Sequence, residues 1–252
     1  MVGPAIISIS RKGKMFNFSD KVIVVTGAAG NLGQAVVKAF LNSGGIVCGV
    51  DHRKGRLADA VNPSQMPGTL FVFEEMDVTH QASVTALAGR IRDEVGRVAV
   101  LVNTVGGFTM GEAVHELKAE TWQKMMDLNV KSFLNTSSAF VPGMITGGGG
   151  KVVSIGAKAS LQGGAKTGAY AVAKSAVLRL TESMAAELKS DHIQVNCVLP
   201  STIDTKENRQ AMPEADYSRW VSPEKIAEVI LFLCSPAANE ITGAAIPVYG
   251  SS

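Results

Sequence analysis

Residues 22–33 read Val-Ile-Val-Val-Thr-Gly-Ala-Ala-Gly-Asn-Leu-Gly, and no other stretch of the chain says as much about its architecture. The apolar, β-branched run at its start predicts a buried strand, and three glycines separate this strand from a helical pattern. Glycine lets a backbone approach phosphate closely, and a helix N-terminus offers free N–H groups and the positive end of a dipole. The order predicts a pyrophosphate site at Gly27, Gly30, Asn31, Leu32 and Gly33; the alternative is an ordinary tight turn.

Outward from this stretch, apolar runs alternate with helical patterns along the whole chain. Continuous apolar strands separated by helices indicate a parallel sheet that is covered on both faces. We therefore predict a single-domain, doubly wound α/β fold of about seven strands. The predicted strands are 22–26, 46–50, 70–73, 98–103, 152–155, 193–199 and 245–248, and the predicted helices are 32–42, 81–95, 119–140, 169–190 and 223–234, with a loop at 147–150.

Composition limits the classes of partner. The chain has 252 residues, 46% hydrophobic and 18% charged, with a net charge of +2. So small a charge argues against nucleic acid or an anionic membrane and favours a small-molecule substrate. No apolar run approaches the roughly 20 residues that cross a bilayer. Residues 1–19 are interpreted as a flexible extension, with a true start at Met15 as the alternative, and residues 20–252 as the folded domain.

The cysteines and histidines point to neither a disulfide framework nor a metal site. Cys48, Cys197 and Cys234 are far apart and lie mostly within apolar runs, which is typical of reduced core thiols and favours a cytoplasmic protein. No pair of histidines has the spacing of metal ligands, and no bound metal is predicted.

Two carboxylates follow predicted strands at positions suited to a nucleotide. Asp51 closes the second strand, where it can accept hydrogen bonds from the adenosine ribose hydroxyls; this favours NAD(H), because a 2′-phosphate would meet like charge. Arg53 and Lys54 could pair with that phosphate, so NADP(H) stays open. Asp77, followed by Val78, is placed beside the adenine pocket, with a helix N-cap at Asp77 or Thr79 as the alternative.

Tyr170 and Lys174 lie four residues apart in a predicted helix, which stacks the phenol and the ammonium on one face. A cation held there favours phenolate and would draw the pKa of the phenol towards the range of a general acid or base. Taken alone, the pair is more typical of a solvated helix face than of a catalytic site.

A series of motifs resembles the short-chain dehydrogenase/reductase family from about Asp20 onward. They are the glycine turn, Asp51, Asp77-Val78, Asn103-Thr104-Val105-Gly106, Asn129, Tyr170-x-x-x-Lys174 and Pro200-x-x-x-x-Thr205. The resemblance implies a Rossmann fold and NAD(P)-dependent hydride transfer to or from a small carbonyl or alcohol. It also implies a homodimer or homotetramer, formed through the long helices at 119–140 and 169–190.

The resemblance also assigns roles to single residues. Tyr170 would be the proton donor or acceptor, Lys174 would hold the nicotinamide ribose and lower the pKa of Tyr170, and Asn129 would position a water in a proton relay. The remaining cofactor contacts would come from Asn103, Gly106, Pro200, Ile203 and Thr205.

Three departures from the family pattern matter. The mildest is that the family's Asn-Asn-Ala-Gly segment reads Asn103-Thr104-Val105-Gly106, which leaves the first Asn and the glycine. Asn31 stands where the family has a glycine, and since Asn tolerates left-handed geometry, phosphate binding should survive. Ala157 stands thirteen residues before Tyr170, where the family has a serine that hydrogen-bonds the reacting carbonyl. The absence of this serine, together with the surrounding motifs, resembles the pattern of the quinonoid dihydropteridine reductase branch. This resemblance implies a quinonoid substrate. The alternative from another class is a catalytically silent NAD(P)-binding sensor or scaffold.

Overall fold

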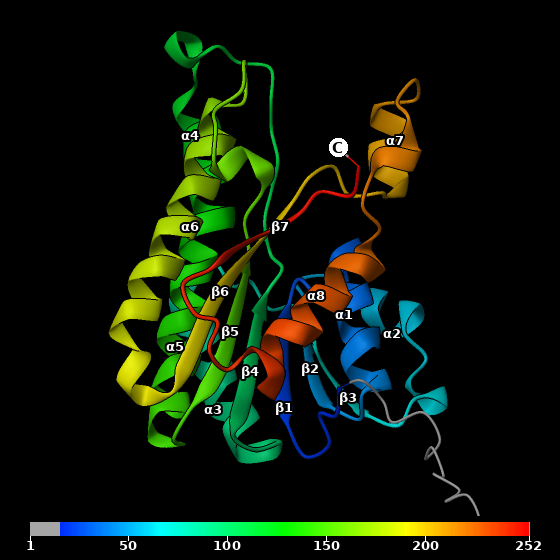
Figure 1. The fold of residues 1–252 in the computed structure, drawn as a ribbon, viewed down its shortest axis with the longest axis vertical. Coiled ribbons are helices and arrows are strands. Elements are labelled where there is room, and N and C mark those ends of the chain that lie inside the picture. Colours follow the sequence, from blue (N-terminus) through cyan, green and yellow to red (C-terminus); the bar gives the residue numbers. More distant parts are fainter. Residues whose placement is uncertain (1–15, 252) are drawn as a thin grey trace, which may run out of the picture.

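A computed structural model describes residues 16–251, and over these residues seven strands form one parallel sheet (Figure 1). The strand order is β3-β2-β1-β4-β5-β6-β7. The predicted fold class is confirmed. The strands are β1 (Val22–Thr26), β2 (Ile46–Val50), β3 (Thr69–Phe73), β4 (Val98–Asn103), β5 (Gly150–Ile155), β6 (Ile193–Pro200) and β7 (Ala245–Val248).

Helices cover both faces of this sheet. The helices α1 (Asn31–Asn42) and α8 (Pro223–Cys234) pack together on one face, and α3 (Gln81–Glu94), α5 (Ser132–Thr146) and α6 (Gly168–Glu187) lie on the other (Figure 1). Ile23 and Val25 belong to the core under α1, whereas Val22 and Val24 belong to the core under α3 and α5. Successive side chains of a strand point to opposite faces, so a strand buried on both sides reads as a continuous apolar run.

The chain reverses its direction of winding at β1. From β1 it proceeds outward to β2 and β3, then crosses back to β4 on the other side of β1. Thr26 pairs in register with Val50 of β2 and with Asn103 of β4. The residues that follow these three therefore meet at the carboxyl edge of the sheet, where open α/β sheets bind their ligands.

The prediction of one continuous helix over 119–140 is wrong in one respect, because the helix is interrupted. It consists of α4 (Ala119–Met126), a π-helical turn over Asp127–Lys131 and then α5. The side chain of Asn129, within the π turn, bonds the backbone of Gly107 in a separate loop, and π turns of this kind often occur at functional sites.

Two short helices were not predicted: α2 (Arg56–Ala60), and α7 (Lys206–Ala211) beyond the end of β6. The loop expected at 147–150 is one residue shorter, since Gly150 begins β5. Single 3-10 turns lie at Pro63–Gln65, Val114–Glu116, Lys158–Ser160, Lys189–Asp191, Tyr217–Arg219 and Pro236–Ala238.

The predicted extension at residues 1–19 lies outside the described residues up to Met15. Phe18, which lies within the described end of that extension, is buried in the core and packs edge-on against Phe40, with ring centroids 4.8 Å apart. Of the helices between residues 16 and 251, none is both long and apolar enough to cross a membrane.

The three cysteines are free and buried in the core. Burial raises the pKa of Cys48 and of Cys234 to about 12 and also raises that of Cys197. At neutral pH all three are therefore thiols rather than thiolates.

Candidate active site

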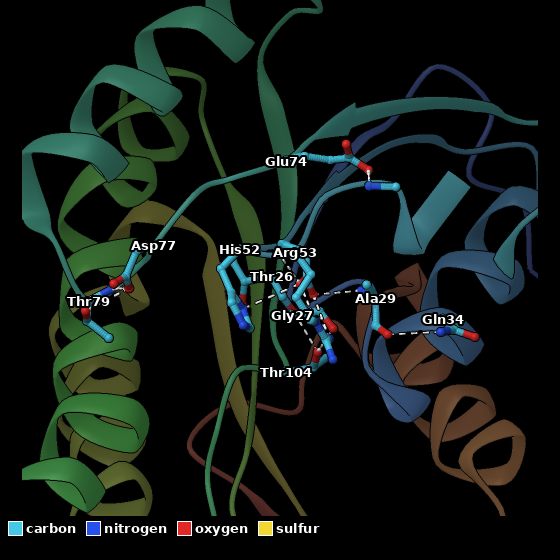
Figure 2. A network of polar contacts seen from close by, with 12 residues as sticks. Thr26, Gly27, Ala29, Gln34, His52, Arg53, Glu74, Asp77, Thr79 and Thr104 are labelled. Carbon is cyan, nitrogen blue, oxygen red and sulfur yellow. Dashed lines mark hydrogen bonds and ion pairs between the residues drawn. The ribbon is translucent and has the colours of Figure 1, made fainter. Parts of the chain in front are cut away.

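The turn after β1 is built for close approach by a ligand. Gly27 has a φ of +64°, and a Cβ on Gly33 would collide with the Gly27 carbonyl oxygen, so both positions require glycine. Thr104, at the end of β4, donates its hydroxyl to the Thr26 carbonyl at 2.6 Å. The Ala29 N–H donates to Asp51 Oδ2 at 2.9 Å from the other side (Figure 2). Neighbouring strands thus hold the turn from both sides.

Asp51 is buried at the end of β2 and is paired with Arg53. Arg53 donates to it from its backbone at 3.0 Å, from Nε at 2.9 Å and from a terminal nitrogen at 3.2 Å. Burial works to raise the pKa of Asp51, but the hydrogen bonds from Arg53 and Ala29 outweigh it and the pKa is lowered. Lys54 instead lies 3.7 Å from Glu75. Of the two cations that the sequence offered to a 2′-phosphate, only Arg53 lies beside Asp51.

Asp77 lies after β3, and its side chain closes a tight turn with Thr79. Asp77 Oδ1 accepts hydrogen bonds from the backbone and the hydroxyl of Thr79, both at 2.8 Å. Figure 2 shows the two residues side by side. The N-cap of α3 is His80, so the alternative that Asp77 or Thr79 caps this helix is wrong. Val78 is buried, and its carbonyl accepts from Asn135 at 2.9 Å.

A first cavity of about 1080 Å³ collects these residues at the carboxyl edge of the sheet. Arg53, Thr79 and Thr104 line it together with the predicted cofactor residues Gly27, Gly30, Asp51, Asp77, Val78 and Gly106.

A second cavity, of about 520 Å³, adjoins the first, and Thr104 and Gly106 line both. Together the two form one cleft along the edge of the sheet. The second cavity contains the predicted site residues Leu32, Gly106, Tyr170, Lys174, Pro200 and Ile203.

Lys174 and Tyr170 enter this second cavity from α6. The Lys174 ammonium is buried and donates to the Ile155 carbonyl at 2.7 Å. Burial lowers its pKa to about 8. The Tyr170 ring packs edge-on against Phe108, with centroids 4.9 Å apart.

The expectation that Lys174 lowers the pKa of Tyr170 is wrong for this structure. Burial raises the pKa of Tyr170 to about 12. The reason is that removal from water disfavours the phenolate, and the neighbouring ammonium is directed at a main-chain carbonyl of β5 instead of at the phenol.

Gly106 brings Asn129 and Lys174 together. A Cβ on Gly106 would lie 2.9 Å from Asn129 Oδ1 and 3.0 Å from Lys174 Nζ, so only glycine fits between them. Asn129 is buried; its Oδ1 accepts from the Gly107 N–H at 3.2 Å, and its Nδ2 donates to the Gly107 carbonyl at 3.1 Å. Asn129 thus fixes the loop that lines both cavities.

Ala157 lines the second cavity, as expected from its distance to Tyr170 along the chain. The two nearest serines do not replace the missing hydroxyl. Ser154 shares a hydrogen bond with the Thr181 hydroxyl at 2.9 Å inside the core, and Ser160 accepts from the Ala157 N–H at 3.0 Å.

Other predicted residues lie elsewhere. Asn31 and Thr205 line a separate cavity of about 300 Å³. Asn31 is not left-handed, contrary to the expectation; it is the first residue of α1, and its side chain donates to Glu207 at 2.7 Å. Asn103 is buried and accepts from the Thr136 hydroxyl at 2.8 Å. Thr205 caps α7 by accepting from the Asn208 N–H at 3.1 Å.

The sequence interpretation missed three residues of this cleft. Thr104 pins the glycine turn, and Phe108 and Lys158 line the second cavity. Thr104 carried a usable signal, since it directly follows the predicted strand at 98–103.

The cleft fits a dinucleotide. Gly27 and Gly30 line the first cavity beside the start of α1, where a phosphate could approach the backbone, and the two adjoining cavities offer separate spaces to the two ends of an elongated ligand. The sequence profile described as "short chain dehydrogenase" matches residues 21–216. The chain belongs to the short-chain dehydrogenase family.

Relatives of this short-chain dehydrogenase are oxidoreductases by name. The chain is 30% identical over 239 residues to a 3-oxoacyl-[acyl-carrier-protein] reductase of Thermotoga maritima, and the match covers 91% of this chain and 96% of that one. It is 32% identical over 241 residues to an NAD-dependent glycerol dehydrogenase of Listeria innocua, covering 91% and 92%.

The fold agrees with solved structures of the family. An L-sorbose reductase of Gluconobacter frateurii, complexed with NADPH and L-sorbose, superimposes with a TM-score of 0.84 at 27% identity, covering 93% of this chain and 97% of that one. The short-chain dehydrogenase described here is an NAD(P)-dependent oxidoreductase. Its relatives include users of both coenzymes.

Proposed function

We propose that this short-chain dehydrogenase transfers hydride between NAD(P) and a small carbonyl, alcohol or quinonoid compound, with Tyr170 as the proton donor or acceptor. The observation that carries the proposal is the placement of Tyr170 and Lys174 in the cavity that adjoins the glycine turn. The bound nicotinamide supplies or accepts the hydride; the protein supplies orientation and the proton.

The raised pKa of Tyr170 suits this residue to donate a proton at neutral pH. A phenol with a pKa of about 12 keeps its proton and is available to donate it to a substrate oxygen or nitrogen. Lys174, whose pKa is about 8, remains mostly charged at pH 7 and would bind the ribose hydroxyls. Asn129 holds the Gly106–Gly107 loop in position, and the proton relay that the resemblance implies for it is part of this proposal.

For the cofactor we propose a preference for NAD(H). The buried Asp51 carboxylate lies in the first cavity, where it would accept hydrogen bonds from ribose hydroxyls and repel a 2′-phosphate. Arg53 is engaged by this carboxylate at two side-chain nitrogens, which limits its reach towards a phosphate. Pro200, Ile203 and Thr205 are proposed to contact the nicotinamide end.

The substrate class follows from Ala157. A ketone gains from a hydroxyl donor at this position, and loss of one such donor typically costs about 10²–10³ in rate. A conjugated, electron-poor quinonoid ring, of the kind that dihydropteridine reductases use, needs that donor less. We therefore favour a quinonoid substrate over an ordinary ketone.

The deciding experiment compares wild type with Tyr170→Phe on carbonyl compounds and a quinonoid dihydropterin. Turnover of NADH should fall by about 10²–10⁴ in the variant, because the phenol proton is lost. The NADH dissociation constant should stay nearly the same, which controls for folding. Stopped-flow hydride transfer at the wild-type rate in Tyr170→Phe would refute the role of Tyr170, and NADH binding without turnover of any compound by the wild type would favour a silent sensor.

We also propose a homo-oligomer that associates through the α4–α5 and α6 surfaces. Trp122, Leu134 and Val172 are large apolar side chains that these helices leave exposed. The mass in solution, from light scattering, tests this; a monomer at micromolar concentration would refute it. A cytoplasmic location stays a prediction.

A further inference from the structure

The second cavity is cationic. Among the described residues that line it are two lysines, Lys158 and Lys174, and no Asp or Glu. The first cavity differs, since acidic residues such as Asp51, Asp77 and Asp127 line it together with basic ones. Positive charge is therefore concentrated where the substrate would bind, and not along the whole cleft.

The two lysines are not equivalent. Lys174 is buried and its ammonium is bonded to Ile155. Lys158 is exposed, and among residues 16–251 no carboxylate forms an ion pair with it; its ammonium lies 5.2 Å from the centre of the Tyr249 ring. Lys158 is thus a cation at the cavity wall whose charge the described part of the chain leaves uncompensated.

The backbone under Lys158 is held in place. The Ala157 N–H donates to Ser160 Oγ at 3.0 Å and closes the 3-10 turn that contains Lys158. Ser175 of α6 donates to the Ser160 carbonyl at 2.9 Å. These bonds tie the turn to the helix that carries Tyr170, so the ammonium and the phenol are attached to one rigid unit.

Apolar groups line the same cavity. Phe108 and Met212 are both exposed large apolar side chains, and Phe108 packs against the Tyr170 ring. A flat apolar body would find contact area on these side chains, while an anionic group at its edge would find a cation.

We propose that Lys158 selects substrates that carry an anionic oxygen group, such as a carboxylate, apart from the reacting centre. This inference rests on the proposed function, because it takes the second cavity as the substrate site. Lys158 acts here as a specificity-determining residue and takes no part in the proton transfer assigned to Tyr170. The substrate class becomes a flat, apolar, reducible compound with one anionic substituent.

The test uses two probes of nearly equal shape, 4-acetylbenzoate and its neutral isostere 4-acetylbenzamide. Calorimetry gives their dissociation constants for the full-length enzyme in saturating NAD⁺. Wild type should bind the benzoate about three- to tenfold more tightly, as a partly solvated ion pair would provide. The preference should shrink as salt is added.

Three variants complete the experiment. Lys158→Met should remove the preference by weakening the benzoate alone, and Lys158→Arg should keep it. Lys189→Met deletes an equally exposed lysine at the far end of α6 and should leave both constants unchanged. Equal binding of the two probes, failure of the benzoate to bind, or a preference that survives in Lys158→Met would overturn the inference.

Failure of the inference can be told apart from failure of the proposed function. The ratio of the two dissociation constants needs no turnover, whereas the role of Tyr170 is judged by hydride transfer. Turnover with equal affinities would remove only the role of Lys158; a clear benzoate preference without turnover would remove only the catalytic proposal.

Discussion

Asn31 Nδ2 and Glu207 Oε2 are 2.7 Å apart, although the two residues are separated by 176 positions in the sequence. Asn31 begins α1 directly after the glycine turn, and Glu207 lies in the first turn of α7, which projects beyond the sheet beside the C-terminus (Figure 1). The short helix α7 is therefore attached to the start of α1, the helix at whose N-terminus we propose that the phosphates bind. The attachment depends on the residue that departs from the family pattern.

Breaking this bond should loosen α7. In Asn31→Ala and in Glu207→Ala, hydrogen exchange of the amides at 206–211 should become about fivefold faster, which corresponds to roughly 1 kcal/mol. The double variant should exchange no faster than the single ones, because both remove the same bond. Gln210→Ala, an exposed position on the same helix, serves as the control. Additive effects would show that the two side chains act independently.

Coenzyme preference should depend on the Asp51–Arg53 pair. Asp51→Asn removes the charge that holds the guanidinium and repels a 2′-phosphate, so the affinity for NADPH relative to NADH should rise about tenfold or more. Fluorescence titration with both coenzymes measures the ratio. Adding Arg53→Ala should cancel the gain, and Asp59→Asn, the same change at an exposed position, should leave the ratio unchanged. An unaltered ratio in Asp51→Asn would contradict this assignment.

The phenol of Tyr170 should stay protonated well into the alkaline range. Its pKa is raised to about 12, so the folded protein holds the neutral form below that pH. Ultraviolet difference titration of wild type against Tyr170→Phe isolates this one tyrosine. We expect no tyrosinate signal from it below about pH 10, the reference pKa of a free tyrosine. A midpoint near neutrality would mean that Lys174 controls the phenol after all.

The contribution of Lys174 to stability should rise with pH. Its pKa is lowered from 10.5 to about 8, so between these values the unfolded chain binds a proton that the folded protein does not. Raising the pH through this window therefore increases the contribution of Lys174 to stability by about 1.4 kcal/mol for each pH unit. The buried cysteines and Tyr170, whose raised pKa values act in the opposite direction above about pH 9, are common to wild type and variant and cancel in the comparison. Lys174→Met lacks this contribution. The free energy of unfolding of wild type minus that of the variant, measured in urea, should therefore increase as the pH is raised. Parallel pH profiles would disprove the depressed pKa, and Lys189→Met should follow wild type.

Restoring a hydroxyl with Ala157→Ser discriminates between substrate classes. On an ordinary ketone the new donor should raise the rate, by up to about 10²-fold, because it stabilises the developing oxyanion. On a quinonoid ring the change should be neutral or harmful. Ala157→Gly, which alters the position without adding a donor, is the control. A large gain on the native substrate would rule out the quinonoid class.

The sheet was predictable because its central strands are buried on both sides. Val24 and Val25 are both fully buried, one under each layer of helices, and such strands leave an unbroken apolar run in the sequence. Because Asp51 and the glycine turn directly follow such strands in the sequence, their position at the carboxyl edge of the sheet was also predictable. The edge strand β3 is more exposed, and its first residue was missed.

Hydrogen bonds between distant segments and the burial of titratable side chains could not be predicted in the same way. The π turn around Asn129 depends on a hydrogen bond to Gly107, and neither Gly nor Pro marks the interruption of the helix. The short helix α7 did leave a local signal, since Thr205 caps it. The pKa of Tyr170 depends on how deeply the ring is packed, a quantity that a spacing of four residues does not contain.

The buried cysteines offer an experimental opportunity. Since Cys48, Cys197 and Cys234 are enclosed in the core and hold their protons at neutral pH, the native protein should react slowly with maleimides. A single cysteine introduced at Gln210, on the outside of α7, would then carry a fluorophore alone, without prior removal of the natural thiols. Its anisotropy would report in real time how that helix responds when coenzyme is added.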